Sequence, residues 1–199
     1  MRITGGIWRS RRLPTVAVPI RPTMDRVRKA IFDRLQSVLP LEGSYVADLF
    51  AGTGALGLEA LSRGASFCVF VERDRRLLHS LRQTLHALGA EAERYRILAD
   101  DVFRVSQRWR ALGLPQLHLV FADPPYRQGL PERLLQALAD ADWLCPGGIL
   151  CLELSRWDRV AHVPEGWQLS AERSFGETSV QWWIWHGTTS TTRHLPRHL

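Results

Sequence analysis

From Tyr45 onward the sequence alternates between short apolar segments and amphipathic segments, and this alternation constrains the fold more than any other feature. The apolar segments have the length of strands, and the segments between them space their apolar residues as helices do. Strands that alternate with helices predict a parallel sheet covered by helices on both faces. The expected strands are 45–50, 67–71, 95–99, 117–122 and 149–154, and the expected helices are 55–62, 74–88, 102–112 and 131–141.

The two ends of the chain depart from this alternation. Residues 167–173 and 179–185 flank a turn near Gly176 and predict an antiparallel hairpin at the sheet edge, which brings the expected strands to seven. Near the start, Thr23 precedes a helical apolar pattern that Pro40 stops. We expect a basic N-terminal arm at 1–22, in which 2–8 can form a short strand, a single α/β domain at 23–186, and a disordered tail at 187–199.

A glycine-rich segment follows the first expected strand. Gly52, Gly54 and Gly57 satisfy G-x-G-x-x-G between a strand and a helix, which is the context of a nucleotide-binding loop. Glycines let the backbone turn tightly there and approach a ligand closely. Glu72 ends the next strand, where a carboxylate can hold two ribose hydroxyls. These residues predict a site for a nucleotide-type ligand, and on this evidence alone NAD is a candidate.

Two acidic features favour S-adenosylmethionine over NAD. Asp48 stands just ahead of the glycine loop, where a carboxylate would repel the pyrophosphate of a dinucleotide. The same carboxylate suits the ammonium and sulfonium groups of S-adenosylmethionine, directly or through water. In addition, Asp123-Pro124-Pro125-Tyr126 follows the fourth strand. Here the sequence resembles the amino-methyltransferases, whose motif is Asn, Asp or Ser, then Pro-Pro, then Tyr, Phe or Trp.

The chemistry of amino-group methylation explains this motif. The exocyclic amino group of a purine is a poor nucleophile, because its lone pair is delocalised into the ring. Acceptors for its two N–H groups, here the Asp123 carboxylate and the Pro124 carbonyl, favour a localised pair on the nitrogen. The Pro-Pro pair stiffens the loop, and Tyr126 can stack on the base. Methyl transfer is then an in-line displacement at the sulfonium that depends mainly on positioning.

Asp100 and Asp101 close the third strand, where an acid commonly meets the adenine amino group of the cofactor in this fold class. Either carboxylate can instead cap the following helix. The family resemblance given below favours Asp101 and the backbone of Val102 for the cofactor contact. The expected cofactor-binding residues are Arg21, Thr23, Asp48, Phe50, Gly52, Thr53, Gly54, Glu72, Asp101 and Val102.

Positive charge is concentrated near the N-terminus. The net charge is +6, and 25 of the 26 basic residues are Arg, Lys29 being the exception. Eight basic residues and one acid lie between Met1 and Lys29. Arg binds phosphate bidentately and stacks on bases, so this cluster predicts a phosphate-binding arm. The residues expected to contact RNA are Arg2, Arg9, Arg11, Arg12 and Arg26.

Other signals are weak. No apolar run reaches the length of a membrane span, and no apolar region follows the basic N-terminal residues. We therefore expect a cytoplasmic protein without membrane contact. Cys68, Cys145 and Cys151 are scattered and form no C-x-x-C pair, so we expect small core residues and no metal site.

A specific family resemblance appears in the N-terminal part of the chain. The segments Arg2–Pro14 and Arg21–Arg28, followed by Ile31-Phe32, resemble the signature of the bacterial 16S ribosomal RNA guanine-N2 methyltransferases. The segments Asp48–Gly64, Glu72–Asp74 and Asp123–Tyr126 continue the resemblance, which covers roughly residues 1–186. Generic amino-methyltransferases share the glycine and Pro-Pro loops but lack the N-terminal signature.

The resemblance implies a Rossmann-like class I methyltransferase fold with S-adenosylmethionine as cofactor. It also implies methylation of N2 of one guanine in 16S rRNA, within a 30S subunit or an assembly intermediate, by a protein that we expect to be monomeric. The family pattern places Arg21 and Thr23 near the cofactor and the entrance of the active site. Two positions depart from the pattern, namely Tyr126 where the family usually has Phe, and Thr53 where it usually has Ser.

Four alternatives stay open at this stage. Tyr126 is common in adenine-N6 methyltransferases, so adenine in DNA or RNA is the nearest rival substrate. Methylation of a protein glutamine amide poses the same chemical problem, although the basic arm argues for nucleic acid. An NAD-dependent oxidoreductase would have no use for the Pro-Pro-Tyr loop. A non-catalytic rRNA-binding protein would bind RNA without transferring a methyl group.

Overall fold

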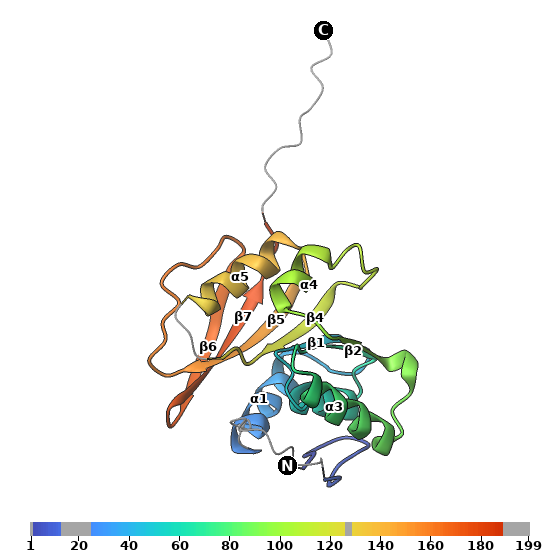
Figure 1. The fold of residues 1–199 in the computed structure, drawn as a ribbon. Coiled ribbons are helices and arrows are strands. Elements are labelled where there is room, and N and C mark those ends of the chain that lie inside the picture. Colours follow the sequence, from blue (N-terminus) through green and yellow to red (C-terminus); the bar gives the residue numbers. More distant parts are fainter. Residues whose placement is uncertain (1, 13–24, 126–128, 189–199) are drawn as a thin grey trace.

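The computed structural model describes residues 2–12, 25–125 and 129–188, and its centre is a seven-stranded sheet. The strand order is β3-β2-β1-β4-β5-β7-β6. Strands β1 to β5 run parallel, whereas β7 pairs antiparallel with both β5 and β6 (Figure 1). The strands are β1 (Tyr45–Leu49), β2 (Phe67–Val71), β3 (Tyr95–Leu98), β4 (Leu117–Ala122), β5 (Leu144–Ser155), β6 (Trp167–Phe175) and β7 (Thr178–Trp185). The predicted α/β class and the antiparallel edge hairpin are confirmed.

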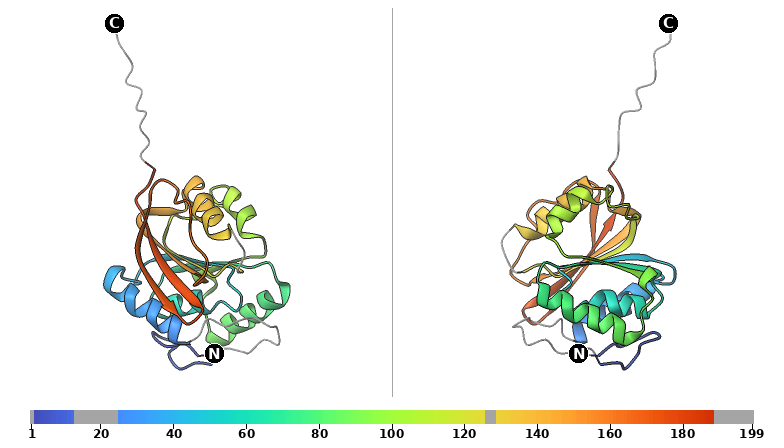
Figure 2. Two further views of the ribbon diagram at one scale, coloured as in Figure 1. Left: turned by 90° about the vertical axis from the view of Figure 1, so that its left-hand side faces the viewer. Right: turned by 45° about the vertical axis from the view of Figure 1, so that its right-hand side comes forward.

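Helices cover both faces of the sheet, because strands that are buried on both sides need two apolar layers. Helices α1 (Asp25–Val38), α2 (Ala55–Ser62) and α3 (Arg75–Leu88) share one apolar core with one face. Helices α4 (Val102–Arg108) and α5 (Leu130–Asp140) share a second core with the other face (Figures 1 and 2). A short 3-10 turn, η1 (Ala92–Arg94), precedes β3. Cys68 and Cys151 are buried core residues, as expected, while Cys145 is half-buried.

The strand order reverses beside β1, and this reversal positions the functional site. β1 pairs with β2 on one side and with β4 on the other, so the connections from β1 and β4 lead to opposite faces of the sheet. Leu49, the last residue of β1, pairs with Ala122, the last residue of β4. In open α/β sheets, ligands bind beyond the carboxyl ends of the strands at such a reversal.

Three local expectations were wrong. β5 begins at Leu144 rather than at the expected residue 149, and Cys145–Gly148 form a bulge within it, since the register shifts between Leu117 and Leu119 of β4. Helix α4 ends at Arg108 rather than at Leu112, because the chain continues in turns. Residues 2–8 form no strand beyond an isolated bridge between Arg2 and Arg12.

The described part of the N-terminal arm, residues 2–12, packs tightly on α2. Ile3 and Trp8 are buried in the first core. Ile7 N–H donates to the carbonyl of Ser62 at 2.7 Å, and Trp8 N–H donates to its hydroxyl at 2.9 Å. Gly6 has a φ of 75°, and a Cβ there would lie 1.7 Å from the Ser62 carbonyl oxygen. Only glycine therefore permits this close approach of the arm to α2.

Candidate functional site

The glycine loop leaves the carboxyl end of β1 and enters α2 in a strained conformation. Phe50, Gly52 and Gly54 have φ values of 57°, 57° and 77°. Left-handed backbone is favourable for glycine but costs an aromatic residue about 1–3 kcal/mol, and such strain clusters at functional sites. A Cβ on Gly54 would lie 2.5 Å from Leu81 Cδ1 in α3. Gly54 therefore packs against α3 too closely to carry a side chain.

Glu72 follows β2 and is fixed by backbone donors. Its Oε2 accepts from Gly52 N–H at 2.9 Å, and its Oε1 accepts from the N–H groups of Arg73 and Asp74 at 2.7 and 2.8 Å. Oε2 therefore keeps a second lone pair for a ligand hydroxyl, whereas Oε1 already accepts two hydrogen bonds. Sequence reasoning assigned Glu72 to the ribose, and the structure adds a direct bond between this carboxylate and the glycine loop.

Asp48 lies beneath the loop. Its side chain is 3% exposed, and its Oδ2 accepts from Gly57 N–H, in the first turn of α2, at 2.8 Å. Its pKa is raised to about 8, mainly by burial and to a smaller extent by the charges of Asp123 and Glu72. The hydrogen bond from Gly57 opposes this rise. These two charges act on Asp48 because all three carboxylates follow or end neighbouring strands at one sheet edge. The hydrogen bond to Gly57 also gives Asp48 a structural role in the loop.

Asp101 and Val102 lie at the start of α4. Asp101 Oδ1 accepts from Phe103 N–H at 2.9 Å, so Asp101 caps the helix, as the alternative interpretation allowed. Val102 is the first residue of α4, where a backbone N–H has no acceptor within its helix. The ring of Phe103 meets that of Phe50 edge-on at 6.4 Å, which brings the start of α4 beside the glycine loop. Asp100 instead pairs with Arg108.

The Pro-Pro loop starts beyond β4, next to the glycine loop. Asp123 is half-buried, Pro124 is buried and Pro125 is exposed. Asp123 directly follows Ala122, whose partner in β1 is Leu49, so the motif and the glycine loop leave adjacent strands at the same edge. The structure therefore brings together the predicted acceptors of Asp123-Pro124 and the predicted cofactor residues. Tyr126, Arg21 and Thr23 lie outside the described residues.

The arginines expected to bind RNA are all exposed, but they do not form one cluster. Arg2, Arg9 and Arg12 are exposed on the arm, and Arg11 donates to the Ala87 carbonyl near the end of α3 at 3.0 Å. The arm also contacts the last residue of α2. Both helix ends lead toward the amino ends of the strands, away from the Pro-Pro loop. Arg26, in contrast, lies in the first turn of α1, over the ring of Phe175 at 5.9 Å.

Sequence reasoning missed a buried ionic network that anchors the arm. Arg28 was counted in the basic cluster, yet it is 1% exposed and lies 3.5 Å from the fully buried Glu59. Glu59 also accepts from the N–H and hydroxyl of Thr4 and from Arg63 at 2.7–2.8 Å. Arg28 therefore cannot contact phosphate. The signal was present in the sequence, because Arg28 lies on the apolar stripe of α1 with Ile31 and Leu35.

Residues 2–12, 25–125 and 129–188 contain neither a membrane-spanning helix nor a cluster of metal-ligating side chains. No helix in these ranges has the length and apolar character needed to cross a membrane. In the same part of the chain, no three or more His, Cys, Asp or Glu side chains are grouped so as to hold a metal ion.

The sheet order, the glycine loop and the carboxylates at its edge define a class I S-adenosylmethionine-dependent methyltransferase. A solved structure of a putative methyltransferase from Escherichia coli superposes with a TM-score of 0.80 and 33% identity, over 94% of this chain and 99% of that one. The chain belongs to the family described as Conserved hypothetical protein 95, whose profile matches residues 1–184.

Named relatives from two bacteria match nearly the whole chain. The protein called "Ribosomal RNA small subunit methyltransferase D" from Escherichia coli K12 is 37% identical over 182 residues, which are 91% of this chain and 88% of the relative. The protein of the same name from Haemophilus influenzae is 33% identical over 91% of this chain and 92% of the relative. The family resemblance noted in the sequence is thereby confirmed.

Proposed function

We propose that this chain methylates N2 of a guanine in 16S rRNA, using S-adenosylmethionine as the donor. The observation that carries the proposal is the placement of Asp123-Pro124 beside the glycine loop, where β4 and β1 end together. Relatives named as small-subunit rRNA methyltransferases support an rRNA substrate. We further propose that the protein acts as a cytoplasmic monomer on a 30S subunit or an assembly intermediate.

The residues at the sheet edge fit S-adenosylmethionine. The Glu72 carboxylate, oriented by Gly52 N–H, would hold the ribose hydroxyls. Asp101 and the Val102 N–H would meet the adenine, and the strained Phe50 would border it. The carboxylates of Glu72, Asp101 and Asp123 favour a cationic ligand over a pyrophosphate. Asp48 adds little to this charge at neutral pH, because burial raises its pKa to about 8. When bound, the cofactor supplies an electrophilic methyl group on a sulfonium.

The Pro-Pro loop performs the work on the acceptor base. The Asp123 carboxylate and the Pro124 carbonyl accept hydrogen bonds from the amino group and localise its lone pair. Both groups are held rigid, since the ring of Pro124 is buried and proline fixes its own backbone. The loop thus fixes the nucleophile in direction and distance, and such positioning can contribute many orders of magnitude to a transfer rate.

A methyl-transfer assay with purified full-length protein tests this function. Labelled S-adenosylmethionine is offered with 30S subunits that lack the modification, deproteinised 16S rRNA, DNA and a release factor, and the products are digested to nucleosides. We expect N2-methylguanosine from one of the two 16S substrates. N6-methyladenosine would assign the adenine alternative instead. Label on the release factor would assign the amide alternative.

Substitution of Asp123 separates catalysis from cofactor binding. We expect Asp123→Ala to abolish turnover while calorimetry shows nearly unchanged affinity for S-adenosylhomocysteine. The matched control is Asp140→Ala, which removes an exposed acid at the end of α5. Loss of both turnover and cofactor affinity would move Asp123 into the cofactor site. RNA binding that survives, with no turnover even in the wild type, would indicate a non-catalytic RNA-binding protein.

A further inference from the structure

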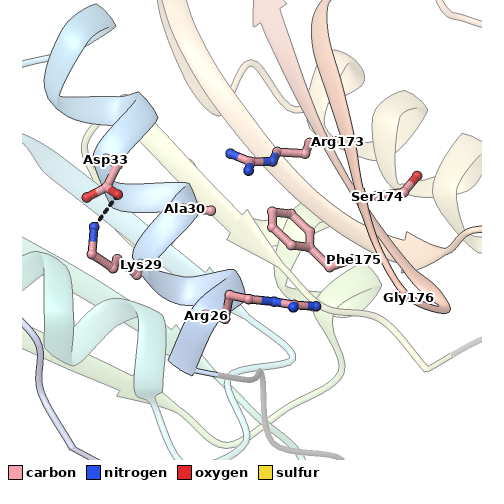
Figure 3. Close-up of a pocket in the computed structure, with 8 residues that line it drawn as sticks. All are labelled: Arg26, Lys29, Ala30, Asp33, Arg173, Ser174, Phe175 and Gly176. Carbon is pink, nitrogen blue, oxygen red and sulfur yellow. Dashed lines mark hydrogen bonds and ion pairs between the residues drawn. The ribbon is translucent and has the colours of Figure 1, made fainter.

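A groove lies between α1 and the tip of the β6–β7 hairpin (Figure 3). Its volume is about 380 Å3. Arg26 and Lys29 line it from α1, and Arg173 and Phe175 line it from the end of β6. The hairpin was predicted from the sequence only as a sheet edge, so its contribution to a charged groove comes from the structure alone.

The groove opens at the same edge of the sheet as the reacting site. Ser155, the last residue of β5, pairs with Thr178, and Thr178 pairs with Phe175 across the hairpin. The hairpin tip therefore lies at the carboxyl end of β5. Because β5 is parallel to β4 and adjacent to it, this is also the edge at which Asp123 leaves β4.

The charges in the groove are unbalanced. The guanidinium groups of Arg26 and Arg173 lie 5.9 and 5.1 Å from the centroid of the Phe175 ring, which lies between them in the view of Figure 3. The one acid that lines the groove among the described residues, Asp33, is bonded to Lys29 at 2.6 Å. Two like charges thus converge on one ring without a carboxylate partner from the described part of the chain.

Such an arrangement favours an anion with more than one charged group. Like charges held near each other repel, and an anion that bridges them relieves the repulsion. Phe175 is buried, so its ring cannot stack with an incoming base, but its face attracts and orients both guanidinium groups. Oriented guanidinium groups match phosphate oxygens bidentately.

We propose that this groove binds the phosphodiester backbone of the RNA substrate on the strand that leads to the reacting guanine. The inference rests on the proposed function and extends it by assigning a backbone contact to the hairpin, through Arg173. Arg34 lies about two turns after Arg26 on α1. Its guanidinium group is 5.3 Å from the centroid of the Trp182 ring and donates to the Ser170 hydroxyl. The positive row thus continues along α1, from the reacting edge toward the opposite edge of the sheet.

The test removes the two charges and measures RNA affinity against salt concentration. The variants are Arg26→Gln, Arg173→Gln and their combination, and the probes are a single-stranded oligouridylate and deproteinised 16S rRNA. Each phosphate contact to single-stranded nucleic acid contributes about 0.7 to the slope of log K against log salt. We expect the double variant to lower the slope by about 1.4 and to weaken binding roughly 25-fold at about 0.1 M salt.

Three controls give the result its meaning. Arg26→Lys and Arg173→Lys keep the charge and should keep most of the slope. Arg110→Gln removes an exposed charge near the end of α4, on the other face of the sheet, and should leave the slope unchanged. In the methyl-transfer assay, the double variant should raise KM for RNA with kcat nearly intact, because the groove holds backbone and not the reacting base.

The outcomes separate this inference from the proposed function. Absence of methyl transfer by the wild type would overturn the proposed function, and the oligouridylate slope would still judge the groove. A double variant with unchanged slope and unchanged KM would overturn the groove assignment while the methyltransferase stands. Normal binding to naked rRNA, combined with lost activity on 30S particles alone, would show that the groove contacts ribosomal protein and would also overturn it.

Discussion

Asp48 offers a sharp test of the electrostatics beneath the glycine loop. The carboxyl group is buried, and its pKa of about 8 compares with 3.8 for an ordinary aspartate. At neutral pH it is therefore largely protonated in the folded protein and ionised in the unfolded chain. Asp48→Asn keeps an oxygen that can accept from Gly57 N–H but never ionises. The variant isolates the effect of the charge from that of the hydrogen bond.

The size of the effect follows from proton linkage. Because the folded pKa is raised, the group stabilises the fold most below pH 3.8, and this contribution is lost as pH rises through 8. Between these limits the free energy of unfolding falls by about 1.4 kcal/mol per pH unit. From pH 5 to pH 7 the wild type should thus lose about 3 kcal/mol that Asp48→Asn does not lose.

Urea unfolding of both proteins across pH 5 to 9 measures this loss. All other titrating groups are shared, so the difference between the two unfolding free energies isolates Asp48. We expect the unfolding free energy of the wild type, minus that of Asp48→Asn, to fall steadily up to about pH 8. It should level off above that pH, where the carboxyl group is ionised in the folded protein as well. Parallel stability curves across the whole range would show that Asp48 is ionised in the folded protein, and the reasoning would then fail.

Three further predictions concern stability and cofactor binding. Glu59→Ala removes a buried carboxylate that accepts from Thr4 and Arg63 and lies beside the buried Arg28, and it should cost about 3–5 kcal/mol in chemical unfolding. The control Asp140→Ala, at an exposed acid, should cost under about 1 kcal/mol; equal losses would show that the buried network is unimportant. Gly6→Ala should cost at least about 2 kcal/mol more than Gly43→Ala, because both have positive φ but only Gly6 meets a backbone oxygen; equal melting temperatures would contradict this. Asp101→Ala should lower the calorimetric affinity for S-adenosylhomocysteine about ten-fold. Asp101→Asn is the companion variant, because its side-chain oxygen can still cap α4; unchanged affinity in both variants would limit Asp101 to capping.

The sequence predicts the framework well because alternating strands and helices carry strong local signals. β2, α2 and β4 match their expected bounds, and Gly89 ends α3 as its position implies. The bulge at Cys145–Gly148 was missed because Pro and Gly signal a turn, whereas pairing with β4 on both sides of it, at Leu144 and from Ile149 onward, joins these residues into one strand. Pairing of this kind depends on distant segments, which no local pattern records.

The fate of each charged side chain was the least predictable feature. Arg26 and Arg28 lie two residues apart in one basic segment, yet one lines a surface groove and the other is buried against Glu59. Arg28 is buried because it lies on the apolar side of α1 and because α2 supplies the carboxylate of Glu59 beside it. Arg173 carried no motif at all. Arg173 faces Arg26 across the groove only because β6 pairs with β7 and α1 packs beside them.

The distribution of charge supports the proposed role of the groove in RNA binding. Asp48, Glu72, Asp101 and Asp123 lie at or just beyond the carboxyl ends of adjacent strands, and this acidic environment suits a cationic methyl donor. The same carboxylates that remain ionised repel the phosphates of an approaching RNA. Positive charge at the neighbouring end of β5 offsets that repulsion where the backbone passes, while the base itself enters the acidic edge. RNA affinity should therefore respond far more strongly to loss of Arg173 than to loss of an arginine near the amino ends of the strands.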